Sequence, residues 1–229
     1  DKGFYHRYTL LEKEVDRVKK EEKEIIINPI QIKEVEITIE GITPLIVNNF
    51  SEKSKQQILD AQMKKAKKEK ELRNPIEDGM RALYWLTPMP KEFTEEAFEK
   101  ALKEGARFGF PAKGIKASIV SGAYRNNMTK DKVSLYGAFL IPEDLVEIKY
   151  DNLKIREDYV RIAHGGTDVR FRPEFEGWSM TFKIRYNENT YSLEQILNFI
   201  NIGGFSCGLG EMRVEKGGNN GSYQVKSTK

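Results

Sequence analysis

The sequence contains a single cysteine, Cys207, and only two histidines, His6 and His164, among 229 residues. One cysteine cannot form an internal disulfide, which is typical of a reducing cytosol. Zinc sites built on Cys/His pairs are excluded, because the chain has too few of these ligands. We expect no metal and no cofactor, although the composition leaves magnesium sites made only of carboxylates open.

Long apolar runs and strong net charge are also missing. No run approaches the roughly eighteen apolar residues that a membrane span needs, and the first residues lack the pattern of an export signal. We therefore predict a cytoplasmic protein, of a bacterial or phage-infected cell, with no membrane partner. The net charge of +3 is too small to indicate nucleic acid by itself.

What is present is enough apolar material for a core, 39% of the chain with 10% aromatic residues. We divide the chain into an N-terminal arm over residues 1–30 and one domain over residues 31–229, with a helical insertion at about 51–105. The arm and the Lys-rich helix expected over Ser51–Arg73 each carry a narrow apolar stripe, too thin for a core but sufficient for a subunit contact. These stripes are Leu11, Val15 and Val18, and Ile58, Leu59 and Met63.

The periodicity of the domain predicts its fold class. Apolar and polar residues alternate over Lys33–Gly41 and Trp178–Tyr186, as in half-buried strands. Helices are expected after Asn74, Thr94, Pro111 and Ser192, and further strands at Leu135–Ile141, Leu145–Tyr150 and Gly221–Ser227. Without the excursions the order is strand, helix, strand pair, strand, helix, strand. We therefore predict an α+β protein with a ferredoxin-like (RRM-type) split βαβ core and an antiparallel sheet.

The segment from Ala106 to Arg125 concentrates positive charge, with four basic residues and no acidic one. Pro111 stands where a helix begins, and Lys113 and Lys116 lie in its first turns. Free backbone N–H groups beside these lysines would form a phosphate site. The alternative is a core helix with solvated lysines.

A second candidate is the glycine-rich segment Gly203–Gly221. Glycines allow the backbone to approach a polyanion closely. The spacing matches neither a Walker loop nor a dinucleotide fingerprint, and the alternative is a flexible connection.

The third candidate is the excursion Tyr159–Pro173, in which arginines alternate with aromatic residues. Arg170 and Arg172 share one face of an extended segment, which suits backbone tracking and base stacking. The alternative is a surface hairpin that uses arginine for local ion pairs. His164 in this segment could act as a general base in RNA cleavage or could be a turn residue.

Together, Pro111–Arg125 and Gly203–Gly221 resemble the RAMP superfamily, which includes the backbone subunits of CRISPR effector complexes. The resemblance implies RNA held across the sheet and the glycine loop by shape and phosphate contacts, and subunits stacked head to tail. Members that cleave their target have an aspartate after the first strand, whereas Pro44–Phe50 offers only Asn48 and Asn49. We also expect related chains in bacteriophage genomes.

We predict a non-catalytic protein that binds single-stranded nucleic acid, RNA in preference to DNA, and assembles cooperatively along the strand as a homo-oligomer or filament. The predicted contacts are Lys113, Lys116, Arg125, Arg161, His164, Arg170, Arg172, Gly208, Gly210, Arg213 and Lys216. Two alternatives remain, a metal-independent endoribonuclease that uses His164 and a phage structural or anti-defence protein.

Overall fold

The structure is a computed structural model that describes residues 29–49, 59, 62–63, 73–161 and 166–228. Gln31–Lys229 forms one compact unit, distinct from Asp1–Ile30. The expected α+β class is confirmed, because this unit combines antiparallel sheets with packed helices. Most of the predicted Ser51–Arg73 helix, all but Leu59, Gln62, Met63 and Arg73, lies outside the described residues.

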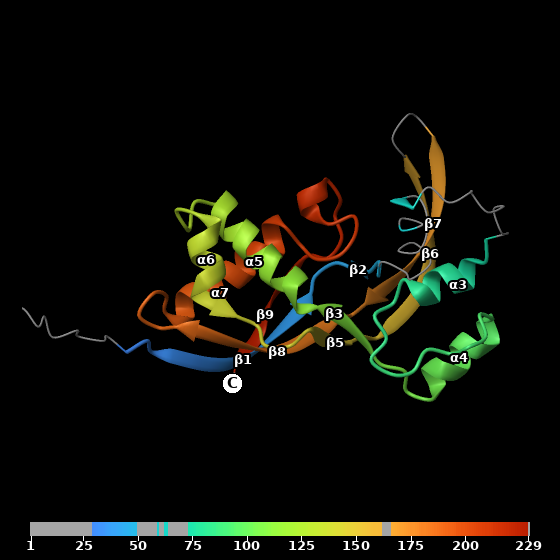
Figure 1. Cartoon of the computed structure of the whole chain (residues 1–229), viewed down its shortest axis with the longest axis horizontal. Helices are drawn as coiled ribbons and strands as arrows, with labels where there is room; N and C mark the ends of the chain where they lie inside the picture. The colour runs from blue at the N-terminus through green and yellow to red at the C-terminus, as the bar shows by residue number, and fades with distance from the viewer. Residues whose placement is uncertain (1–28, 50–58, 60–61, 64–72, 162–165, 229) are drawn as a thin grey trace, which may run out of the picture. The chain divides into compact units, whose positions relative to one another are not determined.

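A six-stranded antiparallel sheet supports the unit (Figure 1). Its path runs β3-β5-β8-β1-β9, with β4 pairing to β8 beside β5. The strands are β1 (Ile32–Gly41), β3 (Phe108–Pro111), β4 (Phe139–Leu140), β5 (Leu145–Lys149), β8 (Ser179–Asn187) and β9 (Tyr223–Thr228).

Helices α5 (Ala112–Arg125), α6 (Lys132–Ala138) and α7 (Leu193–Ser206) lie on one side of this sheet (Figure 1). If β1, β4 with β5, β8 and β9 are numbered one to four along the chain, they lie side by side in the order 4-1-3-2, with α5 and α7 as the two crossover helices. This topology is that of the split βαβ fold.

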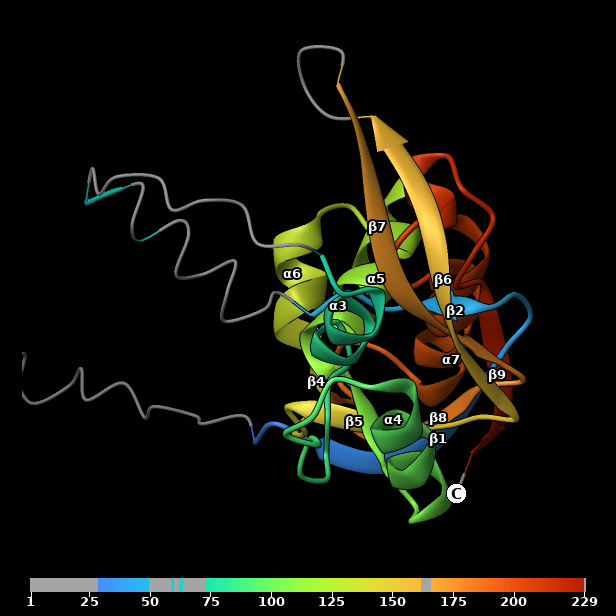
Figure 2. The same ribbon diagram turned by 90° about the vertical axis from the view of Figure 1, so that its right-hand side faces the viewer.

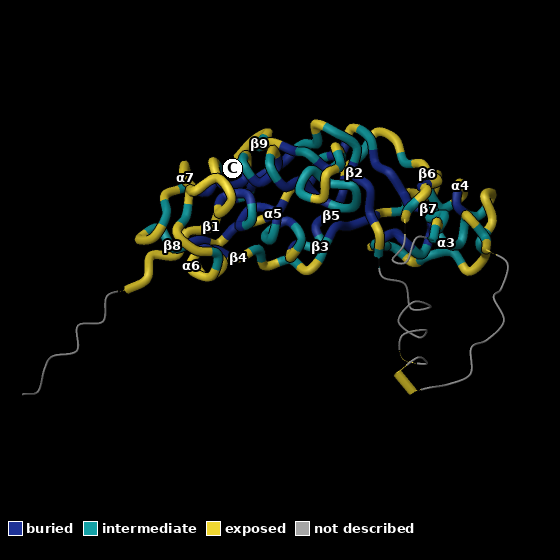
Figure 3. The backbone as a smooth tube through the Cα atoms, turned by 90° about the horizontal axis from the view of Figure 1, so that it is seen from above, coloured by how far each residue is buried: buried dark blue, intermediate teal, exposed yellow. Residues whose placement is uncertain are grey.

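Alternation along the two central strands places their apolar side chains under the helices. Val35 pairs with Ile184, and Ile37 pairs with Phe182 across β1 and β8. All four side chains are buried. Above them α5 and α7 approach so closely that a β-carbon on Gly122 would lie 2.5 Å from the Cα of Gly203. The sheet and the two helices therefore share one core, and Figure 3 marks the buried residues of the chain in dark blue.

The expectation of a strand over Leu135–Ile141 is wrong for most of its length. Lys132–Ala138 is α6, and only Phe139–Leu140 is extended. The reason is an N-cap that lies outside the apolar run: the Asp131 carboxylate accepts a hydrogen bond from the backbone N–H of Ser134 at 2.7 Å. A short apolar run fits either element, and the cap decides it.

A second sheet contains β2 (Leu45–Ile46), β7 (Thr167–Glu176) and β6 (Asn152–Arg161), in the order β2-β7-β6. Strands β6 and β7 form one long hairpin between β5 and β8, visible side by side in Figure 2. Only the base of this hairpin meets β2. The Arg-rich excursion Tyr159–Pro173 therefore belongs to a β-hairpin.

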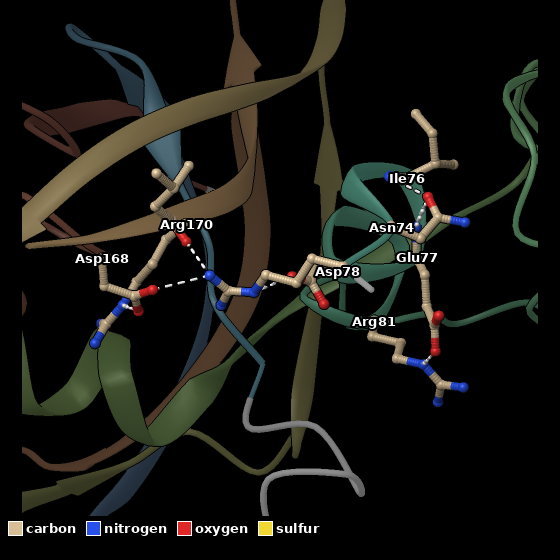
Figure 4. Close-up of polar contacts among 9 residues, drawn as sticks. Asn74, Ile76, Glu77, Asp78, Arg81, Asp168 and Arg170 are labelled. Atoms are coloured by element: carbon tan, nitrogen blue, oxygen red, sulfur yellow. Dashed lines mark hydrogen bonds and ion pairs between the residues drawn. The ribbon is translucent and has the colours of Figure 1, made fainter. Parts of the chain in front are cut away.

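Helices α3 (Pro75–Arg81) and α4 (Glu95–Lys103) follow in the insertion, capped by Asn74 and Thr94 as predicted. Arg73 connects α3 to the hairpin, because its guanidinium lies 3.2 Å from the Asp78 carboxylate and 2.9 Å from that of Asp168. Figure 4 shows Asp78 on α3 and Asp168 on β7 facing this junction.

Three further observations concern membrane-spanning helices, metal ligands and the single thiol. Among the described residues, no helix has the length and apolar character to cross a membrane, and no three His, Cys, Asp or Glu side chains gather as metal ligands. Cys207, just after α7, is buried, and its burial raises the pKa of the thiol.

Candidate nucleic-acid interface

The N-terminus of α5 opens into a cleft of about 590 Å³, lined by Lys113 and Lys116. Strand β3 leads directly into this helix at Pro111, and no side chain caps its first N–H groups. The Ala112 N–H donates to the Asp144 carbonyl. The backbone N–H groups that follow it belong to the first turns of α5, where the lysines also lie. A helix N-terminus with adjacent lysines favours an anion.

Lys116 lies in an unusual environment for a lysine. Its amine is 5.3 Å from the ring centre of Phe139 and 5.9 Å from that of Tyr136. Burial lowers the pKa of Lys116, whereas Lys113 is exposed. A partly desolvated ammonium group interacts more strongly with an incoming phosphate than one in bulk water does.

The cleft also holds carboxylates. Glu143 accepts a hydrogen bond from the backbone N–H of Lys183 at 3.1 Å and so faces the sheet. Asp144 lines the cleft beside the lysines. Glu143 lines the cleft as well, so the lysines and the helix N-terminus share it with two acidic side chains, which an anionic ligand must tolerate.

Arg125 and Arg213 come together at the other end of α5. The Glu215 carboxylate lies 2.7 Å from Arg125 and 3.0 Å from Arg213. Lys216 is exposed in the adjacent turn. Twelve residues of helix, about 18 Å, separate Lys113 from Arg125, so these basic groups form a second location and not one site with the cleft.

The glycine-rich segment serves packing within the protein. Gly208 and Gly210 adopt left-handed φ values of +71° and +73°. The Leu209 N–H donates to the Gly221 carbonyl and the Glu211 N–H donates to the Ile46 carbonyl, both at 2.8 Å. These donors are therefore unavailable to a polyanion. Contact of Gly208 and Gly210 with nucleic acid remains a prediction.

The hairpin arginines differ in depth. Arg161 is exposed near the tip, and Arg170 is half-buried beside Asp168. Arg172 is only 4% exposed, so it does not lie on an open face with Arg170, and its contact with nucleic acid remains a prediction. Its depth has a plain cause: Arg172 lies at the hairpin base, where β2 and the glycine-rich segment cover it. His164 lies outside the described residues.

In the part of the chain that the structure describes, the face of the six-stranded sheet away from the helices presents none of the aromatic side chains that stack bases. On β1 and β8 it presents Glu34, Glu36, Thr38, Glu40, Thr181, Lys183 and Arg185. Lys183 lies 3.1 Å from Glu34. On β5 a hydrogen bond from Arg107 lowers the pKa of Glu147 to about 2. Because acids compensate these bases, the cleft at α5 is the better candidate for a strand.

Sequence reasoning missed a polar cluster where the two sheets meet. Asn48 follows β2, and its amide lies 3.4 Å from the carboxylate of Glu211 in the glycine-rich segment. The Tyr84 hydroxyl donates to the Asn48 carbonyl at 3.4 Å, and Tyr84 with Asn49 lines the cleft. Burial and the negative charge of Glu211 raise the pKa of Tyr84. The cluster and the cleft are thus contiguous, although 163 positions separate Asn48 from Glu211.

Two solved structures are similar to this chain at low sequence identity. A chain in the cryo-EM structure of the type III-B Cmr-β complex bound to cognate target RNA shares 10% identity at a TM-score of 0.48, covering 100% of this chain and 67% of that one. The crystal structure of Cmr6 from Pyrococcus furiosus shares 8% identity at a TM-score of 0.38, covering 86% of this chain and all of that one.

No protein-family model and no curated protein matches the sequence. At these identities and TM-scores, neither similarity carries an argument about the superfamily or the function of this chain, and neither bears on a phage origin. The function must therefore be argued from the site.

Proposed function

We propose that this protein binds single-stranded nucleic acid, RNA in preference to DNA, without cleaving it. The observation that carries the proposal is the cleft at the start of α5, where Lys113 and Lys116 flank a helix N-terminus without a side-chain cap. Phosphate contacts of this kind give affinity without reading sequence.

The strand in this proposal enters at the lysine cleft and continues past Tyr84 to the polar cluster around Asn48. Both ends lie on one contiguous surface, because Tyr84 lines the cleft and bonds to Asn48. RNA is preferred because hydroxyl and amide groups on this path can bond a 2′-OH. Arg125, Arg213 and Lys216 provide a second phosphate contact for a longer strand.

Copies of the protein assemble along the strand in this proposal. Leu59 and Met63 of the predicted insertion stripe are both exposed, as a subunit contact requires. A head-to-tail contact does not close on itself, so repetition gives rings or open filaments.

Binding is tested with an end-labelled, unstructured RNA, the same sequence as DNA, and a duplex. We expect the RNA to bind with a Kd of about 1–100 µM or tighter near physiological salt, the DNA more weakly and the duplex most weakly. The RNA should stay intact for hours with magnesium or with EDTA. Absence of binding at low salt would refute the proposal, and cleavage that is lost in His164→Ala would favour the endoribonuclease.

A further inference from the structure

The polar cluster around Asn48 and Glu211 continues through Arg172 to Asp158, at the base of the hairpin. This part of the cluster contains buried groups without hydrogen-bond partners. Arg172 is 4% exposed and Asp158 is 5% exposed. Within the described part of the chain, Nε of Arg172 and Oδ2 of Asp158 are buried and make no hydrogen bond. Buried polar groups are nearly always satisfied, by protein, water or ligand, so these two atoms leave place for one further polar group, a water molecule or part of a ligand.

The contacts that Arg172 does make are long. Its Nη2 lies 3.6 Å from Oε2 of Glu211, and its Nη1 lies 3.8 Å from Oδ2 of Asp158. Both exceed the usual hydrogen-bond range of about 2.7–3.2 Å. The Asn48 amide approaches the other Glu211 oxygen at 3.4 Å. The side chain of Glu211 is 40% exposed, so its carboxylate can accept further hydrogen bonds.

The charge of the cluster selects against a phosphate. The four carboxylates of Asp158, Glu174, Glu176 and Glu211 outnumber the three cationic groups of Lys154, Arg156 and Arg172 that pair with them. An anion would meet unfavourable negative charge here. A neutral ligand that both donates and accepts hydrogen bonds fits better, and a nucleobase is such a ligand.

We propose that Glu211, Asn48 and Arg172 bind the Watson–Crick edge of a guanine in the bound strand. Guanine presents two adjacent donors, N1–H and N2–H₂, which match the two oxygens of one carboxylate. Its O6 acceptor lies beside them, where the donors of Asn48 or Arg172 can reach it. Adenine and cytosine each offer a single donor group, and uracil offers one N–H between two acceptors. The inference rests on the proposed function and adds one base-selective position to it.

The test compares three RNAs of about 20 nucleotides in which uridine alternates with guanosine, inosine or adenosine, so that a purine is available in any register. Inosine lacks only the N2 amine of guanine. We expect wild-type protein to bind the guanosine repeat at least about tenfold more tightly than the other two, because a matched bidentate pair discriminates by this order.

Glu211→Gln identifies the residue responsible. It replaces one acceptor by a donor, so it should abolish the preference for guanosine, measured as the ratio of the affinities for the guanosine and adenosine repeats, in which any effect of the lost charge on both RNAs cancels. The matched control is Lys113→Ala with Lys116→Ala, which should weaken all three RNAs by the same factor. If Glu211→Gln lowers the melting temperature strongly, Asn48→Ala serves in its place, and the wild-type comparison needs no variant.

Equal affinity of wild-type protein for the three repeats would overturn the guanine site while leaving single-strand binding intact. Failure to bind any of them would overturn both. A guanosine preference that persists unchanged in Glu211→Gln and Asn48→Ala would place base selection elsewhere and also refute this assignment.

Discussion

Gly210 packs against Ile46 so closely that a β-carbon on Gly210 would overlap the Ile46 carbonyl oxygen. The same oxygen accepts the Glu211 N–H at 2.8 Å. This contact attaches the glycine-rich segment to β2 and sets the position of Glu211 beside Asn48. The backbone approach, and not only the left-handed φ, requires glycine.

Gly210→Ala should therefore destabilise the protein more than strain alone explains. Gly217→Ala is the matched control, because Gly217 has a similar φ of +80° but open space around it. A left-handed alanine costs about 1–2 kcal/mol, and we expect Gly210→Ala to cost at least about 2 kcal/mol more. Urea denaturation measures both values, and equal losses would contradict the packing argument.

Lys113 and Lys116 should dominate the salt dependence of RNA binding. For single strands, log affinity falls by about 0.7 per phosphate for each unit of log salt concentration. Replacing both lysines by alanine should flatten this slope by about 1.4 while changing the melting temperature little. Asp144→Asn, which removes one of the two acidic side chains of the cleft, should strengthen binding. An unchanged slope in the double variant would remove the lysines from the interface.

RNA affinity should fall at alkaline pH earlier than an ordinary lysine would cause. Burial lowers the pKa of Lys116, so its amine loses its proton below the usual value of about 10.4. We expect affinity to decline by about fivefold at 0.1 M salt, the contribution of one phosphate contact, as pH rises through that pKa. Lys116→Arg stays charged and should abolish the decline. A decline that persists in Lys116→Arg would assign it to another group.

Cooperative assembly should depend on the N-terminal arm. The stripe of Leu11, Val15 and Val18 predicts a subunit contact, and neighbouring copies on one strand raise each other's effective concentration. Deleting residues 1–24 should reduce cooperativity on long RNA more than affinity for an RNA that holds one copy. Binding isotherms with sedimentation measure both, and non-cooperative binding by the full chain would contradict the assembly.

The elements that local chemistry determines were predictable from the sequence. Alternation identified β1 and β8, and Ser192 marked the start of α7, where the structure shows a capping box with Gln195. The helix α6 was missed because its signal is a single side chain, Asp131, ahead of an apolar run that fits a strand equally well.

The site was predictable only where its residues are close in sequence. Lys113 and Lys116 lie one turn apart and do share a cleft. Spacing also placed Arg170 and Arg172 on one face of β7. The alternation of a strand does not tell how deeply a side chain is buried. Arg172 is buried because segments distant in the sequence, among them the one with Glu211, pack over it. The pairing of Asn48 with Glu211 depends on how β2 meets the glycine-rich segment, which no local pattern encodes.

The burial of Cys207 makes the chain suitable for optical measurements. The only native thiol is inaccessible and of raised pKa, so maleimide dyes should react with an introduced surface cysteine and leave Cys207 unmodified. Tyr159 on the hairpin and Lys91 in the insertion are both exposed. With Tyr159→Cys and Lys91→Cys, energy transfer between two dyes can report whether a bound strand displaces the hairpin, without first removing a native cysteine.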